Sequence, residues 1–499
     1  MIRRLSATVG VMAALLAMTA ALSSPSSPGT ASAAAEFVAL ASPQRLLDSR
    51  PTGGTDDGLF AGIGVRPSGS VVELQVAGRA GVPGDAESVA LNVTADAALE
   101  GGFTTVFPCG SAVPNASNLN YAVGQTIANA VIARLGVDGK VCIYNFGATN
   151  LIADVTGYFP PGAFDALSQP QRLLDSRPTG GTVDGQFAGI GVRAAHSTLE
   201  LTVAGRAGVP ANAGAVALNV TVDAARGGGF VTVLPCGAAL PTASNLNYVS
   251  GQTIANAVVA RIGANGAVCF YTDGATDLIV DVTGVFPATT LNTLEAPRRL
   301  LDTRPGQSTV DGLFAGGGIR PAGGTVQLLV GGRAGVPIGA SAVILNITAD
   351  AAAGDGFVTV HPTGTGRPNA SNLNYRQGQT IANAAIARVG VGGQICLYTF
   401  GSTHLIVDVA GWLTGPAPAT TGSPCPADPP PPTTTTTTST TAPTTTSPGI
   451  PPNPGDTVNC SDFATQAAAQ AYYDQYYPYY GDVAGLDGDG NGIACESLP

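Results

Sequence analysis

The chain has 499 residues, enough for several domains, and charged residues make up only 11% of it while glycine and proline number 67 and 37. This composition favours many short strands joined by turns over helices with charged outer faces. The formal charge of −11 argues against nucleic acid and anionic lipid as partners, because both bind basic patches.

The first 33 residues have the three parts of a secretory signal peptide. Arg3 and Arg4 form a positive start, residues 9–22 are apolar, and residues 31–33 (ASA) form a small-residue cleavage site. An uncleaved or lipid-modified leader is the alternative, although no cysteine closely follows the apolar stretch. Since no second stretch of about 18 apolar residues exists, we expect a secreted, extracellular protein without a membrane span, associated with the cell wall at most.

One stretch of 18 residues, SNLNYAVGQTIANAVIAR, organises the rest of the chain. It begins at Ser117 and returns nearly unchanged at Ser244 and Ser371, each time 127 residues further on. A period of this length indicates three copies of one domain, each large enough to bury a core and to fold independently. We place the repeats at residues 37–161, 164–289 and 291–416.

Within each repeat, apolar residues alternate with polar ones, which is typical of half-buried strands. In residues 72–76 (VELQV) the apolar side chains are expected to point inward. In residues 89–94 (VALNVT) the same pattern predicts that Asn92 and Thr94 point outward. Roughly seven to nine such segments per repeat predict a mainly β fold of three tandem antiparallel β-sandwiches or small barrels.

A turn between two strands recurs with different residues in each repeat. The first repeat has Asp138-Gly139, the second has Asn265-Gly266 and the third has Gly392-Gly393. All three dipeptides tolerate positive φ at both positions, as a two-residue type I′ turn requires. We therefore expect a β-hairpin here, with its two flanking strands paired.

The spacing of cysteines follows the repeat. Cys109 and Cys142 lie 33 residues apart, and so do Cys236 and Cys269. In an exported protein this spacing predicts one disulfide within each of the first two repeats.

The third repeat breaks this pattern, because Thr363 replaces the first cysteine of the pair. We expect Cys396 to pair instead with Cys425, just beyond the repeat, and Cys460 to pair with Cys495 in the tail. An intermolecular bond through Cys396 or Cys425 is the alternative.

Residues 417–457 are rich in proline and threonine, including the runs PPPP and TTTTTT. Such a segment cannot bury a core, and its prolines favour extended, solvated backbone. We expect a disordered linker between the repeats and a small tail at residues 458–499. Clustered threonines beside proline are also compatible with O-glycosylation.

The tail contains a run of oxygen-bearing side chains suited to calcium. Asp487, Asp489 and Asn491 alternate with glycines, as in the first half of an EF-hand loop, and Ile493 is placed to offer its carbonyl. A complete EF-hand loop has a glutamate at its twelfth position, which here is leucine. The available acid is Glu496, two positions earlier.

Residues 459–496 resemble the Excalibur domain, a small extracellular calcium-binding region with the pattern Asp-x-Asp-x-Asp-Gly-x-x-Cys-Glu. This chain departs from that pattern only at Asn491, which remains an oxygen ligand. The resemblance implies Ca²⁺ held by Asp487, Asp489, Asn491 and Glu496, with the tail cysteines bridged. A solvated Asp/Gly turn closed by a disulfide is the alternative.

The tail is also expected to contain a helix. Ser461 and Asp462 are expected to cap a helix that runs through about Tyr476 and stops at Pro478, which makes the tail a small α/loop domain.

The repeats resemble tandem modules of secreted actinobacterial proteins in their phrases LLDSRP, AGRAGVP and GQTIANA. That resemblance implies export and a β fold, but no activity.

Charged residues recur at equivalent positions of the three repeats. Structural ion pairs are the simplest interpretation, because an unpaired buried charge is costly, and a polar ligand site is the alternative. The residues are Asp48, Arg50, Arg79, Arg134 and Asp154, then Asp175, Arg177, Arg206, Arg261 and Asp281, then Asp302, Arg304, Arg333, Arg388 and Asp408.

Amide and aromatic side chains recur as well, and their chemistry suits sugars. Hydrogen bonding within strands and turns explains them equally well. The amides are Asn118, Asn120, Asn245, Asn247, Asn372 and Asn374, and the aromatic candidates for ligand binding are Tyr121, Tyr248 and Tyr375.

The repeats lack a recurrent catalytic constellation, since His196, His361 and His404 occupy non-equivalent positions. We therefore expect no enzyme but a secreted or cell-surface modular binding protein with a calcium-binding tail. A cell-wall or glycan-binding protein acting through the repeats is the alternative, and an extracellular hydrolase is a remote one. The expected partner is a cell-wall glycan or another surface protein, with no nucleic acid and no membrane.

Overall fold

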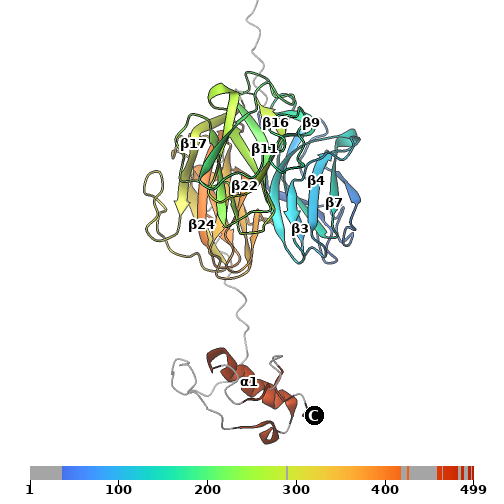
Figure 1. Ribbon diagram of the computed structural model, residues 1–499, viewed down its shortest axis with the longest axis vertical. Helices are drawn as coiled ribbons and strands as arrows, with labels where there is room; N and C mark the ends of the chain where they lie inside the picture. Colours follow the sequence, from blue (N-terminus) through green and yellow to red (C-terminus); the bar gives the residue numbers. More distant parts are fainter. Residues whose placement is uncertain are drawn as a thin grey trace, which may run out of the picture. The chain divides into compact units, whose positions relative to one another are not determined.

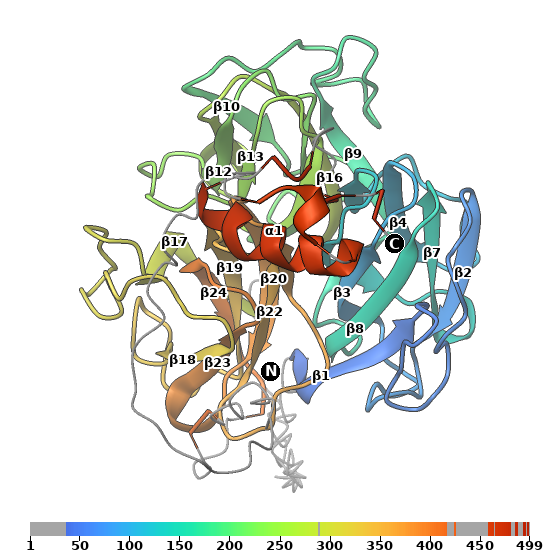
Figure 2. The ribbon, with the colours of Figure 1, turned by 90° about the horizontal axis from the view of Figure 1, so that it is seen from below.

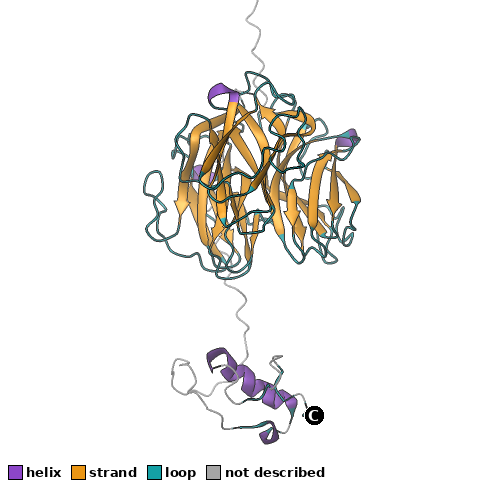
Figure 3. Ribbon diagram, viewed as in Figure 1, coloured by secondary structure: helices purple, strands orange, loops and turns teal. Residues whose placement is uncertain are grey.

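The computed structural model describes residues 36–287, 290–416 and 424–425, and in the tail residues 458–463, 465–480, 485–487, 493–495 and 497–498. The chain divides into two compact units, residues 1–431 and 432–499. Strands make up the first unit, and the second contains the helix α1 (Figures 1 and 3). The predicted signal peptide and the predicted linker, apart from residues 424–425, lie outside the described residues.

The strands form six four-stranded antiparallel sheets, two from each repeat, and the spatial order of strands is the same in every repeat. In repeat 1, one sheet has the order β1 (Val38–Asp48), β8 (Asn150–Phe159), β3 (Ser88–Asp96) and β6 (Ile127–Arg134), and the other has β2 (Ser70–Gln75), β7 (Lys140–Phe146), β4 (Gly102–Pro108) and β5 (Leu119–Tyr121).

In repeat 2, the sheets are β9 (Asp165–Asp175), β16 (Asp277–Phe286), β11 (Ala215–Asp223) and β14 (Ile254–Arg261), and β10 (Ser197–Thr202), β15 (Ala267–Thr272), β12 (Gly229–Pro235) and β13 (Leu246–Tyr248). In repeat 3 they are β17 (Leu291–Asp302), β24 (His404–Leu413), β19 (Ala342–Asp350) and β22 (Ile381–Arg388), and β18 (Gly324–Leu329), β23 (Gln394–Thr399), β20 (Gly356–Pro362) and β21 (Leu373–Tyr375). Short 3₁₀ turns cover η1 (Val137–Gly139), η2 (Ala264–Gly266) and η3 (Val391–Gly393).

The six sheets are arranged as the blades of a propeller, which we call the head (Figure 2). The edge strands β6, β14 and β22 contact one another, and β5, β13 and β21 each contact the edge strand of the next repeat. This arrangement corrects the expectation of three separate sandwiches or barrels. The mainly β, antiparallel character of the repeats is confirmed.

The repeats share buried surface in addition to apolar residues buried within a repeat, such as Leu74, Leu91 and Ile143 of repeat 1. Phe159 of repeat 1 packs against Phe164 and Phe286 of repeat 2, with ring centroids 5.3 and 5.9 Å apart. Leu413 of repeat 3 belongs to the same buried cluster. Part of the apolar surface of each repeat is therefore covered only by its neighbours, and independent folding of a single repeat stays a prediction.

Strand β3 shows how this arrangement departs from a half-buried sandwich strand. Val89, Leu91 and Val93 are buried, as predicted. Asn92 and Thr94 were expected to face outward, yet they are 3% and 1% exposed. The alternation correctly separates the two faces of the strand, but the second face is covered by another repeat rather than by water.

Asparagine pairs close the ring of repeats. Asn129 donates from Nδ2 to Asn219 Oδ1 at 3.0 Å, and Asn256 does the same to Asn346 at 3.0 Å. Asn383 completes the cycle by donating to Oδ1 of Asn92 at 3.1 Å. Each repeat is thus hydrogen-bonded to the next through buried amides.

The predicted turn has the predicted backbone conformation. Asp138 and Gly139 have φ values of 58° and 70°, and the second repeat has 60° and 69° at Asn265 and Gly266. The predicted hairpin is wrong, because β6 pairs with β3 while β7 pairs with β2 and β4. The turn carries the chain from one sheet of the repeat to the other.

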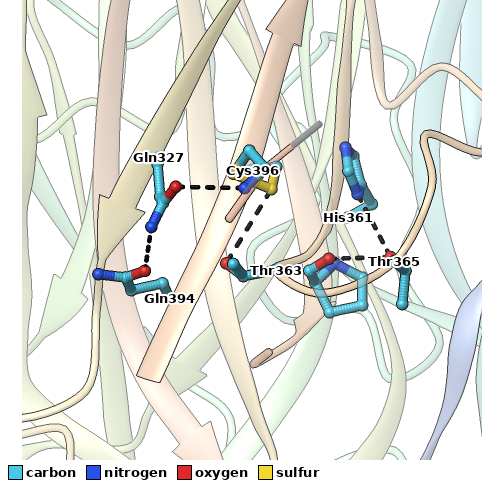
Figure 4. The surroundings of a disulfide bond; sticks show 8 residues. Gln327, His361, Thr363, Thr365, Gln394 and Cys396 are labelled. Carbon is cyan, nitrogen blue, oxygen red and sulfur yellow. Dashed lines mark hydrogen bonds between the residues drawn. A yellow bond between two sulfur atoms is a disulfide. The ribbon is translucent and has the colours of Figure 1, made fainter. Parts of the chain in front are cut away.

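All four predicted disulfides are present: Cys109–Cys142, Cys236–Cys269, Cys396–Cys425 and Cys460–Cys495. The third one attaches the chain just beyond the last repeat to β23. Figure 4 shows its surroundings, where Gln327 Oε1 accepts a hydrogen bond of 3.2 Å from the backbone N–H of Cys425. Thr363, at the position of the missing cysteine, lies with Oγ1 4.0 Å from Cys396 Sγ.

The tail has one 3₁₀ turn, η4 (Cys460–Asp462), and one α-helix, α1 (Gln466–Tyr480), within its described residues. The predicted caps of the helix are wrong, since Thr465 Oγ1 accepts a hydrogen bond from the N–H of Ala468 at 3.3 Å. Asp462 instead accepts from the N–H of Asn459 at 2.8 Å and so closes η4. The helix also continues past Pro478.

Among the described residues, no helix combines the length and the apolar character that a membrane span requires.

Candidate functional site

The tail holds both ends of the predicted calcium loop in place. Cys495, which is bonded to Cys460 through its disulfide, donates from its backbone N–H to Leu486 O at 2.8 Å. This hydrogen bond joins the two sides of the loop at its base. Gln470 Oε1 on α1 accepts from the N–H of Ala494 at 2.8 Å. The residues on either side of the predicted ligands are therefore fixed by backbone and side-chain hydrogen bonds.

Asp487 is the first predicted ligand and is half-buried beside the helix. Tyr473 donates from its hydroxyl to Asp487 Oδ2 at 3.1 Å, which orients the carboxylate. The side chain of Ile493 is 46% exposed, which is compatible with a role for its carbonyl alone. Asp489, Asn491 and Glu496 lie outside the described residues.

The donor set of the tail fits calcium. Its predicted ligands are all carboxylate, amide or carbonyl oxygens, the donors that Ca²⁺ prefers. Cys460 and Cys495 are joined to each other, so they offer no thiolate to a softer metal. Within the described part of the chain, no group of three or more histidine, cysteine or acidic residues is placed to hold a metal.

The recurrent aspartates of the head form ion pairs with Arg50, Arg79 and their equivalents or with a further arginine, as the simpler interpretation predicted, whereas Arg134 and its equivalents are not part of these pairs. Arg45 donates to Asp154 through Nε at 2.8 Å and Nη2 at 3.3 Å, and to Asp48 through Nη1 at 3.1 Å. Asp48 also accepts from Arg50 at 2.7 Å. The sequence analysis missed Arg45, although the repeated phrase RLLD contains it in every repeat.

A second recurrent pair lies nearer the surface. Arg79 donates from Nε and Nη2 to the two oxygens of Asp57, both at 2.7 Å, and this lowers the pKa of Asp57 to about 2. Arg206 with Asp184 and Arg333 with Asp311 repeat the arrangement. Arg388, the third-repeat equivalent of Arg134, donates to a backbone carbonyl instead of a carboxylate. The acceptor is Ala39 O, at 3.4 Å.

The predicted aromatic ligand-binding residues are buried and serve the fold. Tyr121, Tyr248 and Tyr375 are 5%, 4% and 3% exposed. Their hydroxyls donate to the carbonyls of Gly147, Gly274 and Gly401 at 2.8, 2.7 and 2.6 Å. Burial raises the pKa of each tyrosine to about 12. Their low exposure does not favour the prediction that these rings bind a ligand, although Tyr121 lines an opening together with Asn120.

The neighbouring amides are structural as well. Asn118 Oδ1 accepts from the N–H of Val106 at 2.7 Å, and Asn245 and Asn372 make the same bond in the other repeats. Asn120 is different, because it is only half-buried and lines a cleft. Asn120 and its equivalent Asn374 each line a cleft between two repeats, and Asn120 also lines a further opening together with Tyr121.

Two similar clefts lie where one repeat meets the next. The cleft between repeats 1 and 2 has a volume of about 360 Å³, and that between repeats 1 and 3 has about 340 Å³. An aromatic residue of β4 or β20 lies on one wall, and an Arg/Asp pair lies on the other. The first cleft is lined by Phe103, Asn120, Tyr144, Arg177, Thr221 and Asp223. The clefts could not be predicted from the sequence, because their walls come from different repeats.

Residues 458–496 match the family model of the Excalibur calcium-binding domain. The tail therefore matches a calcium-binding domain, as the motif predicted. A stretch of 41 residues is 54% identical to an uncharacterised protein of Pasteurella multocida (strain Pm70), covering 8% of this chain and 52% of that protein. The chain thus spans about half the length of this curated relative.

Solved structures resemble the chain only remotely. The tandem CBM22-1–CBM22-2 domain of Paenibacillus barcinonensis Xyn10C is 12% identical over 50% of this chain and 100% of that chain, with a TM-score of 0.15. A structure of Sulfolobus Turreted Icosahedral Virus is 10% identical over 70% of this chain and 85% of that chain, with a TM-score of 0.16. TM-scores this low carry no argument about function.

Proposed function

We propose that this is a secreted or cell-surface binding protein in which the head binds a partner and the tail binds calcium. The observation that carries the proposal is the Excalibur match at residues 458–496, together with the disulfide that closes this domain. Four disulfides are typical of proteins that fold in an oxidising, extracytoplasmic compartment.

In the tail, Asp487, Asp489, Asn491 and Glu496 supply side-chain oxygens to Ca²⁺, and Ile493 supplies its carbonyl. The support for this assignment is the alternate spacing of the oxygen donors and the hydrogen bond that orients Asp487 from Tyr473. Affinity is expected on the order of 10⁻⁴ to 10⁻³ M, as in extracellular modules. Calcium at extracellular concentrations would then occupy the site.

Calorimetric titration of the full-length protein with CaCl₂ tests this assignment. Asp487→Asn removes one negative ligand and is expected to weaken binding at least about tenfold, because charge count sets the affinity of such sites. Asp462→Asn is the matched control, since Asp462 closes η4 and is not a predicted ligand. Equal calcium affinity in the Asp487→Asn variant and the wild type would exclude Asp487 from the site.

For the head we propose binding rather than catalysis, with a cell-wall glycan or another surface protein as partner. Its recurrent aspartates are engaged in ion pairs with arginines, which suits a structural role better than acid–base chemistry. Glycan binding is the more specific alternative, and the aromatic and amide residues of the inter-repeat clefts favour it.

A further inference from the structure

We propose that the cleft between repeats 1 and 2 is a binding site for a short, uncharged oligosaccharide. This inference rests on the proposed binding role of the head, but it does not depend on the calcium-binding tail. It moves the expected glycan contacts from the buried tyrosines to the cleft around Asn120, with Phe103 and Tyr144 as the aromatic residues.

One wall of the cleft presents aromatic rings from repeat 1. Phe103 on β4 and Tyr144 on β7 are both half-buried, and their ring centroids lie 6.1 Å apart. Asn120 on β5 lies beside them. Partly exposed rings next to an amide offer an apolar face for the C–H side of a sugar and a polar group for its hydroxyls.

The opposite wall comes from repeat 2 and is polar. Arg177 and Asp223 face the cleft, with Arg177 Nη1 3.6 Å from Asp223 Oδ2. With a volume of about 360 Å³, the cleft is within the range of small-molecule sites. The two walls together combine an apolar face with a few polar groups, which is the usual composition of a ligand pocket.

A buried hydroxyl on this wall lacks a hydrogen-bond partner. Thr221 is 1% exposed, and within the described part of the chain its Oγ1 has no partner. Thr94, the equivalent residue in the cleft between repeats 1 and 3, is also 1% exposed and unpartnered among the described residues. A buried hydroxyl without a partner is costly, and its recurrence at equivalent positions marks the polar wall of both clefts.

The charges of the cleft favour an uncharged ligand. Arg177 is already paired with Asp175 at 2.7 Å, and Arg172 is paired with Asp281 at 2.8 Å. With Asp223, three carboxylates therefore surround two guanidinium groups. Phosphate, sulfate or uronate groups would find no uncompensated positive charge, whereas sugar hydroxyls can bond to both members of an Arg/Asp pair.

The clefts differ in how open their aromatic wall is. Val113 lines the first cleft, while the equivalent residue at the second is Arg367. The guanidinium carbon of Arg367 lies 3.8 Å from the ring centroid of Tyr398 and so covers the face that Tyr144 leaves accessible. At the boundary between repeats 2 and 3, Arg299 Nη2 donates to Thr242 O at 2.9 Å. We therefore assign the cleft between repeats 1 and 2 as the main site.

Calorimetric titration of the full-length protein with cellotetraose, mannotetraose and xylotetraose, and with trigalacturonate as the charged comparison, tests the proposal. At least one neutral tetrasaccharide is expected to bind with one site per chain and at least tenfold more tightly than trigalacturonate. Tyr144→Ala and Asn120→Ala are each expected to weaken this binding at least tenfold. Tyr271→Ala is the control, because this half-buried tyrosine is the repeat 2 equivalent of Tyr144, lies outside the cleft lining and should change affinity less than twofold.

A gain-of-function variant keeps the test independent of misfolding. Arg367→Val replaces the arginine that covers Tyr398 with the residue type found at Val113 in the first cleft. It is expected to raise the stoichiometry from one site to two. Thermal melting of each variant checks its folding, and titrations in EDTA separate this site from the tail, since removing calcium should leave sugar binding unchanged. Failure of all three neutral sugars to bind, or tighter binding of trigalacturonate, would overturn the proposal, as would equal losses in Tyr144→Ala and Tyr271→Ala.

Discussion

At the scale of single residues, the head uses its few charges in pairs that hold loops to strands. Arg79 is buried and its guanidinium carbon lies 5.2 Å from the ring centroid of Phe60, while both oxygens of Asp57 accept from it. The same arrangement in all three repeats indicates a structural role. Such pairs matter because a buried arginine without its carboxylate partner strongly destabilises the folded state.

We expect Asp57→Asn to destabilise the head by about 1 kcal/mol at neutral pH, a modest value because the carboxylate is partly exposed to solvent. The folded pKa of Asp57 is about 2, below the value of about 3.9 for an unfolded aspartate. Its contribution is therefore complete above about pH 4 and is lost as the pH falls toward 2. Urea unfolding of the wild type and of Asp57→Asn at pH 7, 4 and 2 measures the difference in their free energies of unfolding.

The exposed Asp85→Asn is the control and should unfold like the wild type at every pH. The difference between wild type and Asp57→Asn should narrow as the pH falls from 4 to 2. A constant difference across this range would show that the stabilising effect does not depend on the charge of Asp57.

At the scale of elements, the turn at η1 links the two sheets of a repeat and needs a left-handed backbone. Asp138 has φ 58° and ψ 22°, a conformation that aspartate, asparagine and glycine adopt more readily than other residues. The three repeats use these three residue types at this position. The requirement is therefore conformational and not chemical.

Asp138→Val should destabilise the head by about 1–2 kcal/mol, because a β-branched residue is strained at positive φ. Asp138→Asn copies the second repeat and should be neutral. Thermal unfolding of the two variants compares them directly. If valine and asparagine gave equal stability, the left-handed conformation at residue 138 would not contribute.

At the scale of the whole molecule, the head unites the repeats through buried contacts that no single repeat can satisfy. The amides of Asn92 and Asn383 bond across 291 positions of the sequence. Asn92 also donates to Ser371 O at 2.6 Å. Removing one repeat would thus leave buried polar groups unpaired as well as apolar surface exposed.

Deleting residues 291–416 should therefore prevent the remaining repeats from forming a stable monomer. We expect aggregation or self-association in light scattering coupled to size-exclusion chromatography, and loss of the cooperative transition in calorimetry. Deleting residues 458–499 is the control and should leave the melting of the head unchanged, because the tail belongs to a separate compact unit. A monomeric two-repeat protein with a sharp transition would show that the repeats fold independently.

The candidate sites illustrate how far local patterns reach. The calcium motif and the cysteine pairing could be predicted, because their residues are close in sequence or follow a strict spacing. Tyr121 has the right chemistry for sugars, but its 5% exposure depends on neighbouring segments that its own pattern does not reveal. The cleft between repeats 1 and 2 could not be predicted, since Tyr144 and Asp223 meet only when two repeats pack together.

The amino-acid sequence by itself determined the threefold repetition, the strands with their two faces, the left-handed turns, the four disulfides and the calcium motif of the tail. Only the tertiary structure decided that the six sheets form one propeller and that β3 is covered on both faces. The physical reason is that alternation and turn chemistry are local, whereas the identity of the surface that covers a face depends on contacts between distant segments.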